Sequence, residues 1–252
     1  LITFYYLYPQ STHYTSITKY PVIPYHYYNP SCTFCPGFTP LLSKKNRRIY
    51  RRLLRGSHVT DRPVLLLKLY RLFTTPHMKI TLIRHTSVAV ENGICYGWTD
   101  VDVAPSFQAE ASQVKQNLKN RTFDTIFCSP LLRCRKLAAF CGFPTPITDD
   151  RLKELNFGEW EMKKWDDIHD PALQCWYKDW IHLPAGGAES YEDQCLRVAD
   201  FLNELRRKNY QHVCIFTHRG VIASAMVYAG FCNAEDSFVT DVPYGSINEL
   251  EF

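Results

Sequence analysis

From residue 78 onward, short apolar runs alternate with longer segments whose apolar residues recur at helical spacing. The short runs have the length of buried strands, and polar turns separate them from the helical segments. Strands that alternate with helices predict an α/β domain with a largely parallel central sheet. We therefore expect strands at 80–83, 123–130, 212–220 and 246–252.

Helices are predicted at 107–120, 131–142, 190–209 and 221–231. The pattern is strongest in 190–209, where apolar residues are spaced four, three, four and three apart at Tyr191, Cys195, Val198, Leu202 and Leu205. Ser106 is available to cap the first of these helices. The Trp-rich segment 163–183 is predicted to be helical on either side of Pro171.

Three of the predicted strands end in turns that carry reactive or cationic side chains. Arg84 and His85 follow the first strand, Ser129 and then Arg133 follow the second, and His218 follows the third. In open α/β sheets, ligands bind just beyond the carboxyl ends of the strands. We expect these side chains to converge at one edge of the sheet.

Two arginines and two histidines at one point suit an anionic phosphoryl group. The planar fork of Arg matches phosphate oxygens, and fixed donors stabilise charge that develops during transfer. Histidine can act as a nucleophile and form a covalent intermediate. The leaving oxygen also needs a proton donor, and segment 151–161 offers Glu154, Glu159 and Glu161.

Each of these signals has a plainer interpretation when it is taken alone. An Arg-His pair is more often the end of a strand than a catalyst. An isolated His218 would be a hydrogen-bonded core histidine, and any one Glu is usually a solvated side chain. The order and placement of all these residues together favour a functional site.

Residues 1–77 differ in composition from the rest of the chain. They contain eleven Lys and Arg, one acid (Asp61), and no Ala or Glu, so their net charge is +10 against −6 for residues 78–252. A basic arm that binds nucleic acid or a membrane surface is one interpretation. We favour another, in which Met78 is the natural start and the basic, Tyr/Pro-rich extension is disordered or translated in error. A targeting peptide is less favoured.

The ten cysteines do not form a disulfide framework. Several fall inside apolar segments, where free Cys behaves as a small hydrophobe. Cys32 and Cys35 form a CxxC pair, but no second pair completes a zinc site. No stretch approaches the ~20 apolar residues that a membrane span requires. We expect a reduced, cytoplasmic protein.

Five motifs, in order, resemble those of the histidine phosphatase superfamily, the phosphoglycerate-mutase-like enzymes. They are LIRHT at 82–86, SPLLRCRKLA at 129–138, RLKELNFGEWE at 151–161, GGAESYEDQCLRV at 186–198 and IFTHRGVI at 215–222. The resemblance spans nearly all of 78–252. It implies a three-layer α/β/α sandwich with a mostly parallel sheet, and a site without metal or organic cofactor.

The same resemblance implies a role for each core residue. His85 would be the phosphorylated nucleophile, and Glu154 the proton donor. Arg84 and Arg133 would clamp the phosphoryl group, to which His218 would donate a hydrogen bond.

Within the superfamily, residues 84–104 resemble the α-ribazole phosphatases, which act in assembly of the cobalamin lower ligand. Thr86 after the histidine and the CYGWTD loop at 95–100 carry this resemblance. In that loop, Tyr96 and Trp98 could offer aromatic faces to a base. Thr99 and Asp100 could bind hydroxyl groups of the substrate. The alternative is that the two aromatic side chains pack the loop onto the core.

Three positions depart from the family pattern. Arg219 replaces the Gly that usually follows the second histidine, which would add a cation or block the site. Leu137 replaces a frequent Thr and is expected to change only packing. Met162 replaces a common Gly after the Trp-Glu pair and is expected to alter the loop over the site.

The sequence favours a phosphomonoesterase acting on α-ribazole 5′-phosphate, a small molecule. A sugar-phosphate or broad-specificity phosphatase, or a small mutase, would use the same chemistry on another substrate. A nucleic-acid or membrane-binding protein with an idle phosphatase-like domain is less favoured, because all four core residues (Arg84, His85, Arg133 and His218) are present.

Overall fold

The structure is a computed structural model that describes residues 78–251. Our expectation for the basic extension, 1–77, therefore lies outside the described residues, as does the CxxC pair. Within the described part of the chain, no helix is long and apolar enough to cross a lipid bilayer.

One five-stranded sheet forms the centre of the fold. Its strands are β1 (Lys79–Arg84), β2 (Thr125–Cys128), β3 (Ile147–Thr148), β4 (His212–Thr217) and β5 (Ile247–Glu251), in the order β3-β2-β4-β1-β5. The first four are parallel, and β5 pairs with the edge of β1 in the antiparallel direction. The short strand β3 was not predicted from the sequence.

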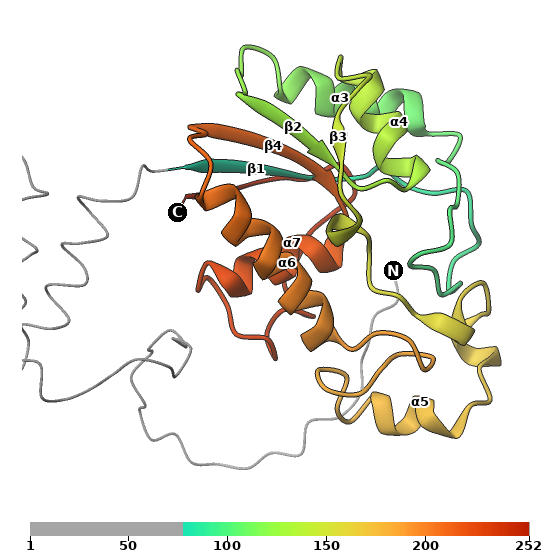
Figure 1. Ribbon diagram of the computed structural model, residues 1–252. Helices are drawn as coiled ribbons and strands as arrows, with labels where there is room; N and C mark the ends of the chain where they lie inside the picture. The colour runs from blue at the N-terminus through green and yellow to red at the C-terminus, as the bar shows by residue number, and fades with distance from the viewer. Residues whose placement is uncertain (1–77, 252) are drawn as a thin grey trace, which may run out of the picture. The chain divides into compact units, whose positions relative to one another are not determined.

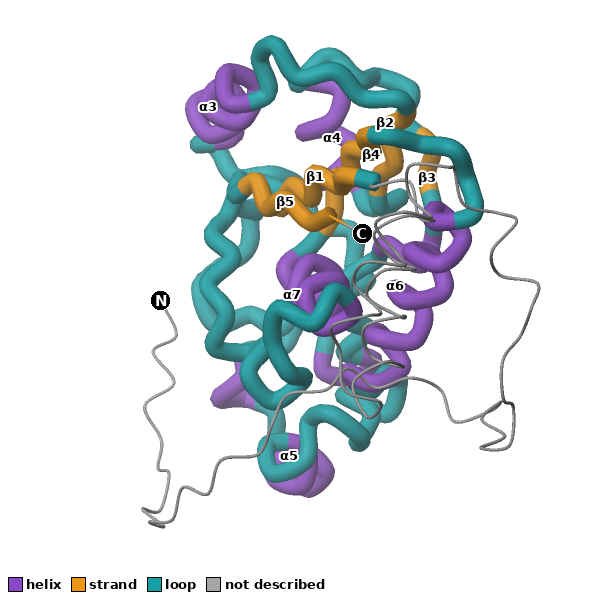
Figure 2. Tube along the Cα trace, turned by 90° about the vertical axis from the view of Figure 1, so that its left-hand side faces the viewer, coloured by secondary structure: helices purple, strands orange, loops and turns teal. Residues whose placement is uncertain are grey.

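Helices cover both faces of this sheet (Figures 1 and 2). Helices α3 (Phe107–Asn117) and α4 (Leu132–Phe140) lie on one face, while α6 (Tyr191–Arg206) and α7 (Arg219–Tyr228) lie on the other. The short helix α5 (Pro171–Trp176) lies away from the sheet. The prediction of a three-layer α/β/α sandwich with a mostly parallel sheet is confirmed.

The two-residue periodicity of the central strands creates these layers. In β4, Val213 and Ile215 pack toward α6 and α7, whereas Cys214 and Phe216 pack toward α3 and α4, and all four are fully buried. Successive side chains of a strand point to opposite faces, so an unbroken apolar run indicates a sheet covered on both sides. Each fully buried large apolar side chain contributes roughly 1.5–3 kcal/mol.

The N-terminal caps of α6 and α3 differ in how well the sequence predicts them. Helix α6 begins with a capping box in which Ser190 and Asp193 satisfy each other's backbone N–H groups. Ser106 occupies the cap position of α3, but its hydroxyl donates to the Glu110 side chain instead of accepting from the backbone. The prediction of a Ser106 side-chain cap was wrong because Glu110 competes for the hydroxyl.

The prediction of helix on both sides of Pro171 was also wrong. Helix α5 starts at Pro171, with the Asp170 carboxylate capping it, and only a short 3₁₀ turn (Trp165–Asp167) precedes it. Proline fits the first turn of a helix but cannot continue one. The tryptophans instead pack together, and the rings of Trp165 and Trp176 stack with centroids 6.0 Å apart.

Candidate active site

The carboxyl ends of β1, β2 and β4 bring their following residues together, as expected. The His85 backbone N–H donates to the Thr217 carbonyl at 3.0 Å, and that of Ser129 donates to the Phe216 carbonyl at 2.9 Å. The imidazole rings of His85 and His218 consequently lie edge to face, with centroids 5.1 Å apart. The carboxyl ends of the parallel strands β1 and β4 therefore bring His85 and His218 together.

The side chain of His85 is oriented by the chain that follows it. Its Nδ1 atom lies 2.7 Å from the Thr86 carbonyl oxygen, and the imidazole is buried. A carbonyl can only accept, so Nδ1 carries the proton and Nε2 of the neutral ring keeps a free lone pair. Burial and the cations Arg133 and Arg84 lower the pKa of His85 well below its usual value, although the bond to Thr86 opposes this. The ring is thus held neutral with Nε2 available as a nucleophile.

Arg84 and Arg133 are held beside His85 by bonds that use only part of each guanidinium group. Nη1 of Arg84 donates to the Val242 carbonyl at 2.6 Å. Arg133 is fully buried at the start of α4 and donates to the carbonyls of Thr99 (3.1 Å) and Gly97 (2.6 Å).

Within the described residues, the buried Nε of each arginine has no hydrogen-bond partner. Unpaired buried donors are costly, and a phosphoryl oxygen would satisfy them. The two arginines therefore offer free donors for an anionic group near His85.

His218 directly follows β4 and is fully buried. Its Nε2 atom lies 2.7 Å from Ser129 Oγ and 3.5 Å from Cys134 Sγ. Burial, and then the charges of Arg133 and the neighbouring His85, lower its pKa well below the usual value. Ser129, which the sequence identified only as part of a turn, is the hydrogen-bond partner of this histidine.

The carboxylate of Glu154 contacts the amino terminus of α7, the helix that begins directly after His218. The backbone N–H of Gly220 is 3.1 and 3.2 Å from its two carboxylate oxygens. A Cβ added at Gly220 would lie 2.3 Å from Glu154 Oε1, so glycine is required for this approach. The positive end of a helix dipole suits a carboxylate there. Gly220 is a site residue that the sequence interpretation missed.

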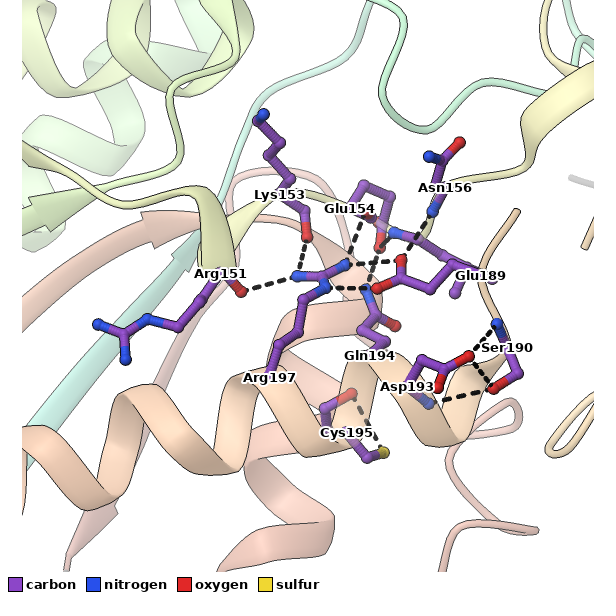
Figure 3. Close-up of polar contacts among 12 residues, drawn as sticks. Arg151, Lys153, Glu154, Asn156, Glu189, Ser190, Asp193, Gln194, Cys195 and Arg197 are labelled. Carbon is purple, nitrogen blue, oxygen red and sulfur yellow. Dashed lines mark hydrogen bonds and ion pairs between the residues drawn. The ribbon is translucent and has the colours of Figure 1, made fainter. Parts of the chain in front are cut away.

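A partly buried ion pair holds the main chain that carries Glu154 (Figure 3). Arg197 of α6 binds both carboxylate oxygens of Glu189, at 2.6 and 3.0 Å. Its remaining N–H groups donate to the carbonyls of Arg151, Lys153 and Glu154 at 2.7, 2.7 and 2.9 Å. A planar, doubly paired guanidinium of this kind fixes geometry as well as charge. It anchors the segment that positions Glu154.

Of the two other glutamates considered, Glu161 has a clear structural role. Its carboxylate accepts from the backbone N–H groups of Trp98 (2.8 Å) and Thr99 (2.6 Å), and from the Thr99 hydroxyl. Burial acts to raise its pKa, but these hydrogen bonds outweigh burial and lower it. Glu161 anchors the loop at 95–100, whereas Glu159 is exposed to solvent.

The structure places the four residues of that loop in different settings. The Thr99 hydroxyl donates to the Glu161 carboxylate. The Asp100 carboxylate accepts from the first backbone N–H of α4, that of Leu132, at 2.6 Å. Trp98 is 38% exposed, and its indole N–H donates to the Glu154 carbonyl at 2.7 Å. Trp98 and Tyr96 make their side-chain hydrogen bonds through the indole N–H and the phenol O–H, so these bonds leave the faces of both rings free.

Tyr244, which precedes β5, was not anticipated from the sequence. Its hydroxyl is 2.7 Å from that of Tyr96, and its ring lies 3.8 Å below the guanidinium carbon of Arg84. The ring centroid is 5.6 Å from that of His85. Two tyrosines, 148 residues apart, thus meet beside Arg84 and His85.

Arg219 does not add a free cation to the site. Its Nη2 donates to the carbonyls of Phe238 and Thr240, the latter at 3.1 Å. The guanidinium therefore ties the start of α7 to the segment before β5.

The other two departures are also resolved by the structure. Leu137 is fully buried among Ile83, Cys214 and Phe216, in agreement with a packing change. Met162 has φ +63°, in the left-handed region that favours glycine, and its N–H donates to the Cys95 carbonyl at 2.8 Å. Met162 thus keeps the turn that a glycine would form, at a cost in backbone strain.

A family model for the histidine phosphatase superfamily (branch 1) matches residues 80–252. The chain belongs to this superfamily. The match covers the whole of the described sheet apart from Lys79, together with every residue of the site described above.

Named relatives within the superfamily differ in substrate. The chain is 26% identical over 155 residues to the adenosylcobalamin/α-ribazole phosphatase of Escherichia coli K12, which covers 58% of this chain and 76% of that protein. It is 25% identical over 160 residues to phosphoserine phosphatase 1 of Hydrogenobacter thermophilus, covering 60% and 75%.

The fold is also found among solved structures. The α-ribazole phosphatase of Shigella flexneri superposes with a TM-score of 0.62 at 24% identity, covering 68% of this chain and 90% of that one. At this level of identity, the superposition supports the fold alone.

Among the described residues, no group of three His, Cys, Asp or Glu side chains could hold a metal ion. The nearest polar partners of His85 and His218 are a carbonyl, a hydroxyl and a thiol. The positive charge beside the two histidines comes from Arg133 and Arg84.

Proposed function

We propose that the chain is a phosphomonoesterase that works through a phosphohistidine at His85. The observation that carries the proposal is the 2.7 Å contact between His85 Nδ1 and the Thr86 carbonyl oxygen, which leaves Nε2 free. The lowered pKa of His85 keeps that atom unprotonated at neutral pH. The unpaired Nε donors of Arg84 and Arg133 would receive the phosphoryl oxygens.

The reaction would proceed in two displacements. In the first, His85 Nε2 attacks phosphorus, the bond to the ester oxygen breaks, and Glu154 gives its proton to the leaving alcohol. In the second, water attacks the phosphohistidine, the P–N bond breaks, and the Glu154 carboxylate takes a proton from that water. Inorganic phosphate and a regenerated His85 result. Arginine donors stabilise the charge that develops on the equatorial oxygens.

We propose α-ribazole 5′-phosphate as the substrate, which would place the enzyme in assembly of the cobalamin lower ligand. Two lines of support are the 84–104 sequence and the name of the Escherichia coli relative. A third is the aromatic pair Tyr96 and Trp98 near Glu154 and the arginines.

A smaller, acidic substrate such as O-phosphoserine is the second candidate. Lys153 places its ammonium 4.6 Å from the Trp98 ring centroid, where it could attract a carboxylate. A relative of that name supports this alternative. Sugar phosphates and phosphoglycerate remain further alternatives with the same chemistry.

A substrate panel tests both levels of the proposal. We expect kcat/KM for α-ribazole 5′-phosphate to exceed the values for O-phosphoserine, glucose 6-phosphate and 3-phosphoglycerate by at least about tenfold, equivalent to about 1.4 kcal/mol. His85→Ala should abolish hydrolysis of every member. A higher value for O-phosphoserine would reject α-ribazole phosphate as the substrate, while residual activity in His85→Ala would reject the phosphohistidine mechanism.

A further inference from the structure

The turn at residues 243–246, just before β5, is attached to the carboxyl end of β1. Gly245 takes φ +68° in this turn, a left-handed conformation that glycine adopts without strain. Its N–H donates to the His85 carbonyl at 3.1 Å, and the carbonyl of the next residue accepts from the Arg84 N–H, also at 3.1 Å. The main chain that follows Tyr244 is therefore fixed to the end of the strand that carries the nucleophile.

The ring of Tyr244 lies against the face of the Arg84 guanidinium group, with the ring centroid 3.8 Å from Cζ. Among the described residues, the Arg84 side chain makes one hydrogen bond, from Nη1 to the Val242 carbonyl at 2.6 Å. One hydrogen bond leaves a planar group free to turn about that bond, whereas a ring against its face limits the rotation. The stack therefore fixes the plane of the guanidinium.

This stacking contact uses a face of the guanidinium and none of its N–H groups. A cation is attracted to the face of an aromatic ring, and arginine stacks there readily. The donors of a guanidinium lie in its plane, so the buried Nε of Arg84, which has no partner among the described residues, stays available. A carboxylate in the same place would occupy such donors. Tyr244 thus holds the arginine without competing with an anion.

Tyr96, from the loop at 95–100, holds the ring of Tyr244 in place. The two hydroxyl oxygens are 2.7 Å apart, and the Tyr96 ring centroid lies 5.4 Å from Cζ of Arg133. Tyr244 is 41% exposed, so this hydrogen bond supplements a limited amount of packing. Burial, and then the neighbouring Tyr244, raise the pKa of Tyr96, so its hydroxyl is protonated at neutral pH. Tyr96 therefore brings no negative charge to the two arginines.

We propose that Tyr244 is a positioning residue for Arg84, and that its ring sets the plane of the guanidinium so that the free donors face the phosphoryl group. This inference rests on the proposed function, in which Arg84 binds that group. Hydrogen bonds weaken steeply when they are misaligned, and a guanidinium binds oxygens in its own plane. A rotated Arg84 would keep its charge but lose aligned hydrogen bonds. We therefore expect the affinity for phosphate itself to depend on the ring.

The direct test measures the dissociation constant of inorganic phosphate with the full chain by isothermal titration calorimetry. Tyr244→Leu removes the ring, and we expect the constant to rise by about fivefold. Tyr244→Phe keeps the ring and should stay close to the original value. Phe231→Leu is the control, because it removes an exposed ring from the same connection between α7 and β5. It should have no effect.

Inorganic phosphate has no organic group on which a ring could stack. If Tyr244 only contacted the organic part of the substrate, Tyr244→Leu would leave the dissociation constant of phosphate unchanged. That result would overturn the inference.

Ring fluorination tests the cation–π contact while it nearly preserves the shape of the side chain. Phenylalanine with one, two or three ring fluorines is placed at position 244, and each fluorine weakens the attraction of the ring face for a cation. We expect the dissociation constant of phosphate to rise with each fluorine. A constant that does not depend on fluorination would mean that the ring acts through its shape alone, and would overturn the inference. This series also provides the test if Tyr244→Leu does not fold.

A double-mutant cycle with Arg84→Met shows whether Tyr244 acts through Arg84. The measured quantity is kcat/KM for an activated aryl phosphate, whose leaving oxygen needs no proton from Glu154. Arg84→Met alone should lower kcat/KM by about 100-fold, as expected for the loss of a donor to the transition state. Tyr244→Leu should then add less than about twofold, because the group that it positions is absent.

Two outcomes of the cycle separate this inference from the proposed function. Equal losses from Tyr244→Leu with and without Arg84→Met would mean that the ring does not act through Arg84, and would overturn the inference alone. If Arg84→Met leaves both kcat/KM and phosphate binding unchanged, the arginine clamp of the proposed function fails and the inference fails with it.

Discussion

The indole N–H of Trp98 donates to the main-chain carbonyl of Glu154 over 2.7 Å. The loop that the sequence associates with specificity is thus attached to the residue assigned to proton transfer. Replacing Trp98 therefore changes the loop at 95–100 and the position of Glu154 together. Experiments on the loop must separate an effect on substrate binding from an effect on Glu154.

For specificity, Trp98→Ala should raise KM for α-ribazole 5′-phosphate by about tenfold, equivalent to about 1.4 kcal/mol, because it removes an aromatic face. Trp98→Phe keeps a ring but loses the bond to Glu154, so it measures the structural contribution. Steady-state kinetics with a small aliphatic phosphate provides the comparison. Equal losses on both substrates would assign Trp98 a structural role.

For the proton donor, Glu154→Gln should lower kcat for aliphatic phosphates by at least 100-fold, in the usual range for general acid catalysis. Aryl phosphates with good leaving groups should lose less than about tenfold. Glu161→Gln is the matched control, because that carboxylate anchors the loop through Thr99. The assignment is wrong if Glu161→Gln, and not Glu154→Gln, makes the rate depend steeply on the leaving group.

Backbone strain at Met162 predicts a stabilising substitution. A non-glycine residue in the left-handed region costs roughly 1–2 kcal/mol, of which the greater freedom of glycine in the unfolded chain offsets about 0.4–1 kcal/mol. Met162→Gly should therefore raise the melting temperature by a few degrees in a thermal unfolding experiment. Asn120→Gly, at φ +68°, should gain less because Asn tolerates this conformation. A lower melting temperature for Met162→Gly would contradict the account.

The two buried histidines predict how stability depends on pH. Their folded-state pKa values are lowered below the unfolded value of about 6.5, so between those values the unfolded chain binds more protons. Stability contributed by their neutral forms is present above about pH 6.5 and is lost as the pH falls below it, by about 1.4 kcal/mol per pH unit for each.

Denaturant unfolding between pH 5 and 7 measures this slope. His218→Gln should make it shallower by the share of one histidine. His182→Gln is the control, because His182 is fully exposed and Asp179 raises its pKa. A slope that stays the same in His218→Gln would show that this histidine is not the source.

The fold could be predicted because each central strand carries its own signal. Runs such as HVCIFT at 212–217 are apolar at every position but the ends, which indicates burial on both faces. The helix prediction for segment 163–183 was wrong because its tryptophans form a cluster that does not follow helical spacing. Two-residue β3 is too short to leave a pattern.

From the residue pattern alone, the site could be predicted where residues stand at the ends of strands, whereas Glu154 was expected from the family resemblance. Arg84, His85 and His218 are placed by the sheet itself, so their convergence follows from the topology. Tyr244 and Gln194 reach the site through contacts with residues far away in the sequence, at Tyr96 and Glu154. A polar residue in the apolar stripe of α6 was the one sequence signal that could have identified Gln194.

For the loop residues Thr99 and Asp100, the sequence did not indicate which groups their side chains contact in the fold. Their side chains suggested hydroxyl recognition, but the structure gives them local partners in Glu161 and the first turn of α4. The sequence shows which groups are present but not which neighbouring donors and acceptors bind them in the fold.

The most direct measurement is rapid-quench labelling of the full chain with a ³²P-phosphate monoester. We predict a label on His85 that is stable to base and labile to acid, absent in His85→Ala and attached at Nε2. An acid-stable, base-labile label, which is characteristic of an acyl phosphate on Glu or Asp, would contradict it.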